Sequence, residues 1–397
     1  MHGPEPPAAG RLVALVSAAH FVSHFYILVL PPVFALVRAD FAVSYTELGL
    51  ALTAFNTVTA ALQTPAGFLV DRISPRAVLV GGLLLGAAAL GLAGMVESFW
   101  LFVALYGVLG LANTVYHPAD YALLSRLPVE RLGRAFSIHT FAGLFGSAIA
   151  PATMLVLAQA FGWRGAFYAS SAVGLAVAAL LLVAGASLAA PTKRAAEPHA
   201  PPAGDWRVLL APAILVNLFF YIALAIGNGG VQNYAVVALG ALYGTPLALA
   251  NTALTAYLGL AALGVLIGGF VAQRVPRHDA VAVIGLATQA LAIGAVALID
   301  TGAALLVALL ALAGLAHGLI MPSRDMLVRA VTPPGAFGRV FGFVTTGFNL
   351  GGMVAPLVFG WLMDRGNPRA VLIAAGASAG VAILTLVLRP RPRREPA

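Results

Sequence analysis

The sequence contains no cysteine, and only 9% of its 397 residues carry a charged side chain. The absence of cysteine excludes disulfides, thiol catalysis and thiolate-ligated metal ions. A G-x-x-x-x-G-K-[ST] phosphate loop and an H-E-x-x-H zinc motif are also absent, and no serine stands in a recognisable nucleophile elbow. These absences argue against an enzyme and against direct use of nucleotide hydrolysis. No cofactor and no metal site is expected from the sequence.

Apolar residues dominate what is present, at 61% of the chain with a mean hydropathy of +0.96. A soluble protein of this length could not hide so much apolar surface, so the composition predicts a multispanning membrane protein. We expect an all-α integral membrane fold with twelve transmembrane helices in two pseudo-symmetric six-helix bundles. The expected spans are 11–37, 46–70, 76–96, 99–125, 134–160, 165–189, 208–238, 247–272, 279–299, 302–328, 336–362 and 369–388.

Basic residues are unevenly distributed between the two ends of these spans. With both termini inside, 18 of the 22 Lys and Arg residues fall on the cytoplasmic side, and the exceptions are Arg38, Arg164, Arg365 and Arg369. The positive-inside rule therefore predicts cytoplasmic termini in a plasma (inner) membrane. The net charge of +8 is assigned to topology and to contact with anionic lipid, not to nucleic acid. The first ten residues do not resemble a signal peptide.

A duplicated segment divides the chain. The stretch 110–151 returns in variant form at 314–356, with pairs such as Gly110/Gly314 and Pro151/Pro356 in register apart from one single-residue slip. We expect a six-helix bundle over 1–189, a cytoplasmic linker over 190–206 and a second bundle with a basic tail over 207–397. A repeated helix pair with polar residues inside apolar helices is typical of transporters.

The loops between the second and third spans of each half carry a further signal. The first reads GFLVDRISPR (67–76), its counterpart reads GFVAQRVPRH (269–278), and FGWR (161–164) precedes the sixth span. Together with the twelve spans and central linker, these loops resemble the major facilitator superfamily over the whole chain. The sequence departs from the family motif at Ser74, where glycine is usual, and at Gln273, where the second copy lacks its acid.

This resemblance implies a gating network at the cytoplasmic ends of the helices. In the family, the residue at Gly67 permits close helix approach, and the acid at Asp71 bonds across to the other half in the outward-open state. Arg72 and Arg76 would join the same network. The alternative is that these charges only obey the positive-inside rule.

A closer resemblance is to the fosmidomycin-resistance exporters. It rests on 19–50, on YHPAD (116–120) and on GRAFSIHTFAGLFGSAIAP (133–151), and it is strongest in the first half. The group's first helix has an acid four residues after its histidine, where this chain has His24. An exporter mechanism that depends on that acid cannot be transferred unchanged.

Histidines inside the expected spans are candidate functional groups, because ionisable residues within a membrane are costly. His20 and His24 lie one turn apart on the first span, and His117 lies at a similar depth in the fourth. They are expected to line the substrate and proton cavity, because histidine changes charge near neutral pH. The alternative is that each only donates a hydrogen bond between helices. His317, alone in the tenth span, is either structural or cavity-lining.

Two interpretations of Asp120 are open. It could accept a transported proton, or it could be the fixed partner of Arg72 or Arg76 in the gate. The second is favoured slightly, because Asp120 approaches the cytoplasmic end. Arg324 and Asp325 occupy the matching place in the tenth span, where a self-compensating pair or a lock between halves is expected.

Uncharged polar residues complete the predicted cavity. Glycines and amides in IGNGGVQNY (226–234) are expected to interrupt the seventh helix, and broken helices are where transporters bind substrate. The candidates are Asn56, Asn113, Asn228 and Gln232. Hydrogen bonding between helices is the alternative for each.

The favoured function is a secondary active transporter that exports a small, anionic or amphiphilic organic solute in exchange for protons. Proton-coupled uptake of an organic acid or other metabolite is the alternative within transport. Metal transport and a membrane enzyme built on a His–Asp pair are less favoured. The expected partners are the solute, protons and the lipid bilayer, and the protein is expected to be a monomer.

Overall fold

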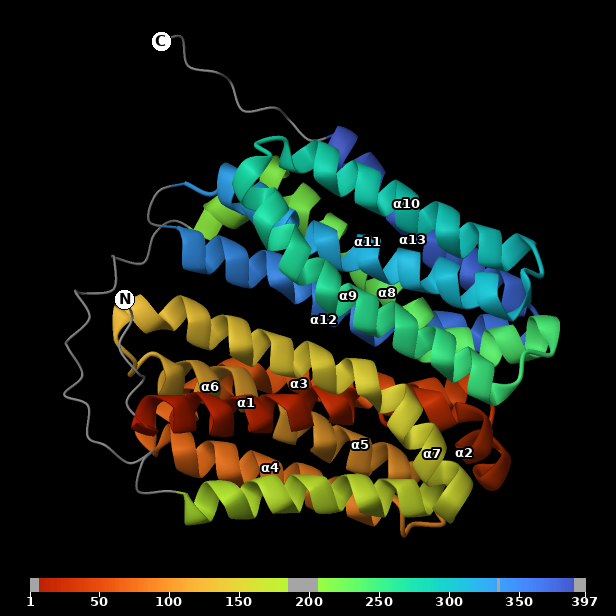
Figure 1. The fold of residues 1–397 in the computed structure, drawn as a ribbon, viewed down its shortest axis with the longest axis horizontal. Coiled ribbons are helices and arrows are strands. Elements are labelled where there is room, and N and C mark those ends of the chain that lie inside the picture. The colour runs from red at the N-terminus through yellow and green to blue at the C-terminus, as the bar shows by residue number, and fades with distance from the viewer. Residues whose placement is uncertain (1–6, 185–205, 334–335, 389–397) are drawn as a thin grey trace. The chain divides into compact units, whose positions relative to one another are not determined.

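The structure is a computed structural model that describes residues 7–184, 206–333 and 336–388. Within these residues every regular element is a helix (Figure 1). The first half of the chain contains α1 Pro7–Ile27, η1 Pro31–Val33, α2 Phe34–Phe41, α3 Tyr45–Arg72, α4 Pro75–Ala93, α5 Phe99–Asn113, α6 Tyr116–Leu124 and α7 Val129–Val183. The second contains η3 Trp206–Leu210, α8 Pro212–Tyr243, α9 Leu247–Arg274, α10 His278–Leu298, α11 Gly302–Val331, α12 Phe337–Asp364 and α13 Pro368–Val387.

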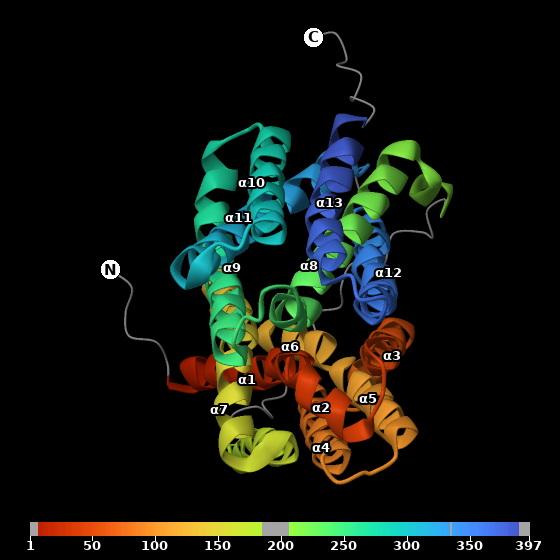
Figure 2. The ribbon, with the colours of Figure 1, turned by 90° about the vertical axis from the view of Figure 1, so that its right-hand side faces the viewer.

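The chain divides into two compact units, Met1–Lys193 and Arg194–Ala397. In the N-terminal unit α1 packs on α7, α3 on α5, and α4 on both α5 and α7 (Figure 2). In the C-terminal unit α9 packs on α11, while α8 lies between α12 and α13. The predicted linker 190–206 and the basic tail fall almost entirely outside the described residues.

Spanning helices account for nearly all of both units. Ten helical stretches among the described residues are long and apolar enough to cross a membrane. One of them, over Glu130–Val183, is interrupted by a non-helical residue at Gly162 and contains two passes. The 28-residue α3 is also long enough to span, which makes twelve helical passes. The all-α fold with two six-helix halves is therefore the observed one.

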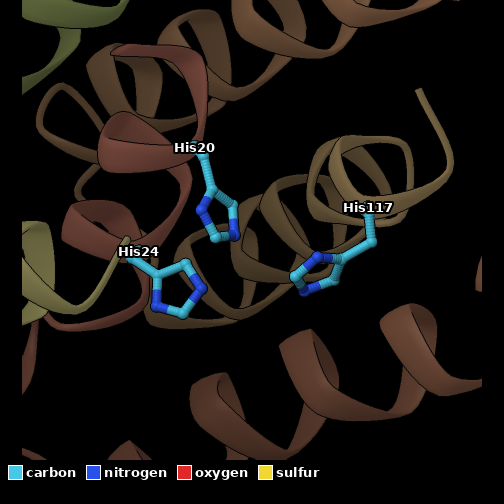
Figure 3. Close-up of side chains that lie close together, drawn as sticks. All are labelled: His20, His24 and His117. Carbon is cyan, nitrogen blue, oxygen red and sulfur yellow. The ribbon is translucent and has the colours of Figure 1, made fainter. Parts of the chain in front are cut away.

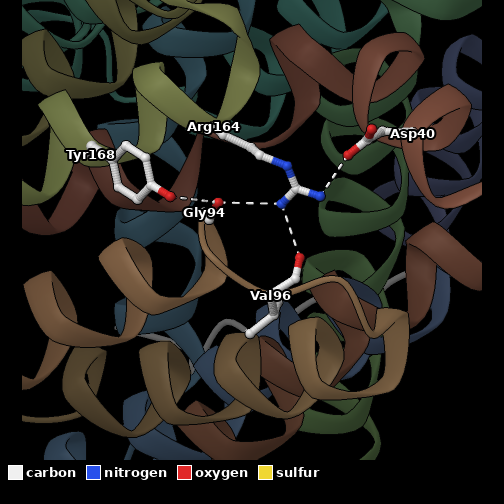
Figure 4. A network of polar contacts seen from close by, with 5 residues as sticks. All are labelled: Asp40, Gly94, Val96, Arg164 and Tyr168. Carbon is white, nitrogen blue, oxygen red and sulfur yellow. Dashed lines mark hydrogen bonds and ion pairs between the residues drawn. The ribbon is translucent and has the colours of Figure 1, made fainter.

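The reversal inside α7 depends on Gly162 and is held by Arg164. Gly162 has φ +70° and ψ 170°, a backbone conformation that residues with a Cβ rarely adopt. Figure 1 shows that α7 folds back on itself. Arg164 then donates to the carbonyls of Gly94 and Val96 at 3.2 and 2.9 Å and to Asp40 Oδ2 at 2.7 Å (Figure 4). The FGWR motif thus fastens the turn of α7 to the α4–α5 connection and to α2.

The first predicted span, 11–37, is divided in the structure. α1 ends at Ile27, a short 3-10 turn covers Pro31–Val33, and α2 follows. Proline lacks the N–H that an α-helix needs and disfavours helical geometry in the residue before it, so consecutive prolines at 31 and 32 end the helix.

The start of α3 follows from its sequence. Ser44 Oγ accepts from the N–H of Glu47 at 3.1 Å, and Glu47 Oε2 accepts from the N–H of Ser44 at 2.7 Å. This reciprocal capping box satisfies two backbone donors that a helix start leaves open.

The expected interruption at 226–234 is wrong, because α8 is continuous from Pro212 to Tyr243. The glycines in this stretch serve packing instead. A Cβ on Gly230 would lie 2.9 Å from Ala375 Cβ and 2.6 Å from Phe359 Cζ, so the missing side chain admits α13 and α12. Glycine in a buried helix is tolerated when it allows such close contact.

The duplicated segments occupy equivalent places in their own units. A Cβ on Gly110 of α5 would lie 2.9 Å from Phe55 Cα of α3, and one on Gly314 of α11 would lie 2.8 Å from Tyr257 Cα of α9. Each glycine therefore lets its helix approach the backbone of a neighbour. The sequence repeat is a repeat of helix packing.

Candidate functional site

The three histidines predicted to line the N-terminal cavity come together. His20 and His24 project from successive turns of α1, and His117 projects from the first turn of α6. Figure 3 shows the three rings turned toward a common space between these helices. The ring centroid of His20 lies 4.6 Å from that of His24 and 5.2 Å from that of His117, and both pairs of rings meet edge to face.

A fourth histidine, His139 of α7, joins this cluster. Its ring stacks on that of His20 with centroids 3.7 Å apart, and its backbone carbonyl accepts a hydrogen bond from His20 Nδ1 at 2.9 Å. His139 was not among the residues predicted from sequence. The sequence does contain a signal for His139, because it is an ionisable residue inside an apolar helix, which is the criterion that selected His20.

Asp120 of α6 is the hydrogen-bond partner of His139. His139 Nε2 donates to Asp120 Oδ2 at 2.9 Å, and the two side chains are 1% and 0% exposed. Asp120 therefore bonds inside the N-terminal unit to a histidine, where the sequence slightly favoured a bond to Arg72 or Arg76. Arg76 Nη2 donates instead to the carbonyls of Leu181 and Leu182 in the last turn of α7.

Gly143 of α7 makes room for the cluster. A Cβ at this position would lie 2.6 Å from His20 Cε1, 2.7 Å from His20 Nδ1 and 3.0 Å from His24 Cδ2. A further polar contact nearby is a 3.3 Å bond between His24 Nδ1 and Ser147 Oγ, one turn further along α7. The glycine-rich part of α7 thus shapes the histidine site as well as packing against α1.

Several polar atoms of the cluster lack a partner in the structure. They are His20 Nε2, His117 Nδ1, His139 Nδ1 and Asp120 Oδ1, all of them buried. Buried polar atoms in proteins almost always have a partner, so each one needs an explanation. A cluster that served only to join helices would use these atoms in hydrogen bonds.

The C-terminal unit has a different polar group at Arg324 of α11. Arg324 Nε donates to Asp325 Oδ1 at 2.9 Å, and the Tyr221 hydroxyl donates to the same oxygen at 2.9 Å. The guanidinium lies over the rings of Tyr221 and Phe348, with Cζ 4.8 and 5.0 Å from the centroids. Arg324 is nearly buried and Asp325 is 44% exposed. The expected self-compensating pair is present, with two aromatic rings added.

A second polar group in this unit surrounds Tyr257 of α9. Its hydroxyl donates to Asn228 Oδ1 at 3.1 Å and receives a 3.4 Å bond from Gln289 Nε2, and His317 stacks on its ring at 6.1 Å. The predicted residues Asn228 and His317 are thus brought together by Tyr257 and Gln289, neither of which was predicted from sequence.

The other predicted cavity residues are more dispersed. Asn56 donates to the carbonyl of Leu52 in its own helix at 2.8 Å. Asn113 lines a small space together with Ser23 and Tyr26, and Gln232 is half-buried on α8. At the predicted gate, a Cβ on Gly67 would meet no atom of the N-terminal unit within 4 Å.

A larger cavity of about 330 Å³ in the N-terminal unit does not contain the histidines. It lies between the start of α1 and the start of α7, with Arg131 and Arg134 on one wall and Val13 and Ala14 on the other. The histidine cluster therefore lies deeper along α1 than this opening.

These observations define a class of protein. Among the described residues, twelve helical passes form two repeated units, and each unit buries a charged side chain on an apolar helix. This architecture is that of a multi-pass membrane protein of the transporter class.

The chain belongs to the Major Facilitator Superfamily, whose family model matches residues 16–244 and 218–397. It is 29% identical to a probable sulfoacetate transporter of Cupriavidus necator, over 89% of this chain and 88% of that protein. It is also 29% identical to an MFS-type efflux pump of Mycolicibacterium smegmatis, over 91% and 86% of the two chains. The fold is similar to that of a bacterial homolog of the human lysosomal transporter Spinster, with a TM-score of 0.80, 15% identity and coverage of 97% and 96%.

The family and its structural neighbours are transporters rather than enzymes. The protein is therefore an MFS transporter of small solutes across a membrane.

Proposed function

We propose that this protein exports a small anionic or amphiphilic organic solute in exchange for protons, by alternating access of its two units. The observation that carries the proposal is the pair of polar groups sequestered on spanning helices, one at Asp120 in the N-terminal unit and one at Arg324 in the C-terminal unit. Charges are rare in membrane helices outside transport pathways and gates, because each costs several kcal/mol, about 3 on insertion scales.

An anionic solute is supported by Arg324 and by one relative. A guanidinium binds carboxylate, sulfonate and phosphonate oxygens in a planar, bidentate manner, and Arg324 is held in place by Tyr221 and Phe348. The relative from Cupriavidus necator is named for sulfoacetate, which is an organic anion.

Export is supported by the relative from Mycolicibacterium smegmatis, which is named as an efflux pump, and by the resemblance of 19–50 and 133–151 to fosmidomycin-resistance exporters. A second candidate is the proton-coupled uptake of an organic acid, and the name of the Cupriavidus relative supports an organic acid as the solute. The two candidates differ in the direction of coupling and not in the class of solute.

The gate and the topology belong to the same proposal. We place Gly67, Asp71, Arg72 and Arg76 in the gate, at the cytoplasmic end of α3 and the start of α4. Asp120 either carries the proton or contributes to the gate, and its bond to His139 supports a role within the N-terminal unit. Both termini are cytoplasmic, the membrane is the plasma (inner) membrane, and the working form is a monomer.

The test is solute uptake by proteoliposomes that hold an imposed pH difference. Sulfoacetate, fosmidomycin, other organic acids and a neutral sugar form the panel. An antiporter accumulates its solute in the acidic compartment and a symporter in the alkaline one, whichever way the protein is inserted. Accumulation of an organic anion on the acidic side is the expected result, and a protonophore should abolish it.

Two results would contradict parts of the proposal. Accumulation on the alkaline side would replace export by the uptake candidate. Exchange that is indifferent to the pH difference would eliminate proton coupling and leave facilitated transport.

A further inference from the structure

We propose that His20, His24 and His117 form a binding site for one divalent transition-metal ion, for which Zn²⁺ is the reference. This site goes beyond the proposed transport of an organic solute and does not depend on it. Each imidazole offers one ring nitrogen, and the three nitrogens lie within 4.8 Å of one another. The rings face a common space, as Figure 3 shows.

The separation of the nitrogens is close to what an ion requires. Zinc–nitrogen bonds of about 2.0–2.1 Å in a tetrahedron place the nitrogens roughly 3.3 Å apart. Binding therefore needs the rings to close by an ångström or so, which small rotations about the side-chain bonds of His24 and His117 can supply. His20, fixed by its bond to α7, is the natural anchor.

The tautomer of His20 is the one that a metal ligand needs. A backbone carbonyl can only accept, so the 2.9 Å contact means that His20 Nδ1–H donates to the carbonyl of His139. Nε2 is then left with a lone pair, is buried, and has no partner. Metal-ligating histidines typically donate the N–H of their other ring nitrogen to a carbonyl or carboxylate in this way.

His117 adds a second unpartnered nitrogen to the same space. Its Nδ1 is buried without a hydrogen-bond partner. Among the residues that the structure describes, no hydrogen bond joins the three rings to one another. A bound ion would accept the ring-nitrogen lone pairs of His20 and His117 that make no hydrogen bond.

The surroundings can compensate the charge of the ion. Asp120 is fully buried nearby and has a free Oδ1, and its other oxygen is bonded to His139, whose ring stacks on that of His20. Asp120 and His139 also form, with His20, a second group of possible ligands that overlaps the first. A single carboxylate supplies one negative charge, and the open fourth position of a three-histidine site can take water or an anionic oxygen.

The ligand set selects the class of ion. Imidazole nitrogens favour Zn²⁺, Cu²⁺, Ni²⁺ and Co²⁺ over Mg²⁺ and Ca²⁺, which prefer oxygen. The room that Gly143 leaves against His20 and His24 is part of the site, since a methyl group there would push both rings.

The experiment is calorimetric titration of the purified, tag-free full-length protein with Zn²⁺, with Co²⁺ absorption as a second readout. We expect one ion per chain, and a loss of affinity of about 100-fold or more in H20A, H24A and H117A, because loss of even an outer partner costs roughly 10–100-fold. Mg²⁺ should not bind at this site. H317A is the matched control, because His317 is a histidine inside a spanning helix of the other unit, and it should leave the affinity unchanged.

Correct folding of each variant is checked by its elution volume and by its thermal transition without metal. If H20A fails to fold, H24Q and G143A carry the test, because H24Q removes one ligand and the added Cβ of G143A displaces the rings of two ligands. Both variants should weaken Zn²⁺ binding. Absence of Zn²⁺ binding to the wild-type protein would overturn the proposal and leave bridging water as the partner of these atoms. Equal weakening in H317A and H24A would also overturn it, as would full affinity in all three histidine variants.

Discussion

The bond between Asp120 and His139 is expected to contribute measurably to stability, and a double-mutant cycle can isolate its contribution. The perturbation is the pair of variants Asp120→Ala and His139→Ala and their combination. Both side chains are almost fully buried, and His139 Nε2 lies 2.9 Å from Asp120 Oδ2. Loss of either partner leaves the other buried and unpaired, which costs about 1–3 kcal/mol in addition to the lost packing.

The expected coupling free energy follows from two magnitudes. Hydrogen bonds between membrane helices average about 0.6 kcal/mol in such cycles and reach roughly 1.7. A bond in which one partner is charged is roughly twice as strong as a neutral one. The coupling between Asp120 and His139 should therefore be about 1–3 kcal/mol.

A matched pair in the same unit provides the control. Arg164 and Asp40 are closer, at 2.7 Å, but their side chains are 32% and 42% exposed. Water and salt screen such a pair, so its coupling should be about 0.2–1 kcal/mol. Burial, and not distance, is predicted to decide the order of the two couplings.

The assay is reversible unfolding of the purified protein in mixed micelles, followed by helical circular dichroism. The coupling is the difference between the cost of the double variant and the sum of the two single costs. A value below about 0.5 kcal/mol for Asp120 and His139 would be additivity within error and would refute the reasoning. A stronger coupling for Arg164 and Asp40 would do the same.

Three further predictions concern packing, capping and substrate charge. Gly314→Ala should destabilise the protein by about 1–3 kcal/mol, because its Cβ would press on the backbone of α9; Gly294→Ala, with no atom within 4 Å, should be neutral or slightly stabilising in the same thermal scan. Ser44→Ala should cost about 0.5–2 kcal/mol through loss of the capping box, while Ser44→Asp should retain most of the stability; equal melting temperatures for the two would contradict this. Arg324→Gln should lower the transport of organic anions at least tenfold and that of neutral solutes much less, measured as initial uptake rates; an equal loss for both would make Arg324 a structural residue.

The class of protein and its repeat were predictable from the sequence. Hydropathy is read over short windows of sequence, and the membrane requires every span to be an apolar helix of about 20 residues. Twelve passes could therefore be located without packing information. The pair Gly110 and Gly314 was identified by register alone, and both glycines proved to admit a neighbouring backbone.

Local structure was less predictable where neighbours decide it. The glycines and amides of 226–234 suggested an interrupted helix, but α8 is continuous. Phe359 of α12 and Ala375 of α13 pack directly against Gly230. Consecutive prolines at 31 and 32, in contrast, ended α1 by their own geometry, although the apolar run continued to 37.

The sequence alone identifies the ionisable residues that lie within spanning helices, because insertion is costly for any such side chain at that depth. It therefore singled out His20, His24 and His117 and placed them at similar depths. Three features depend on how the helices pack: the convergence of these rings, the orientation of His20 by the His139 carbonyl, and the bond between Asp120 and His139. The rotation of each helix about its axis sets these contacts, and that rotation is fixed by packing against α7, through gaps such as the one at Gly143.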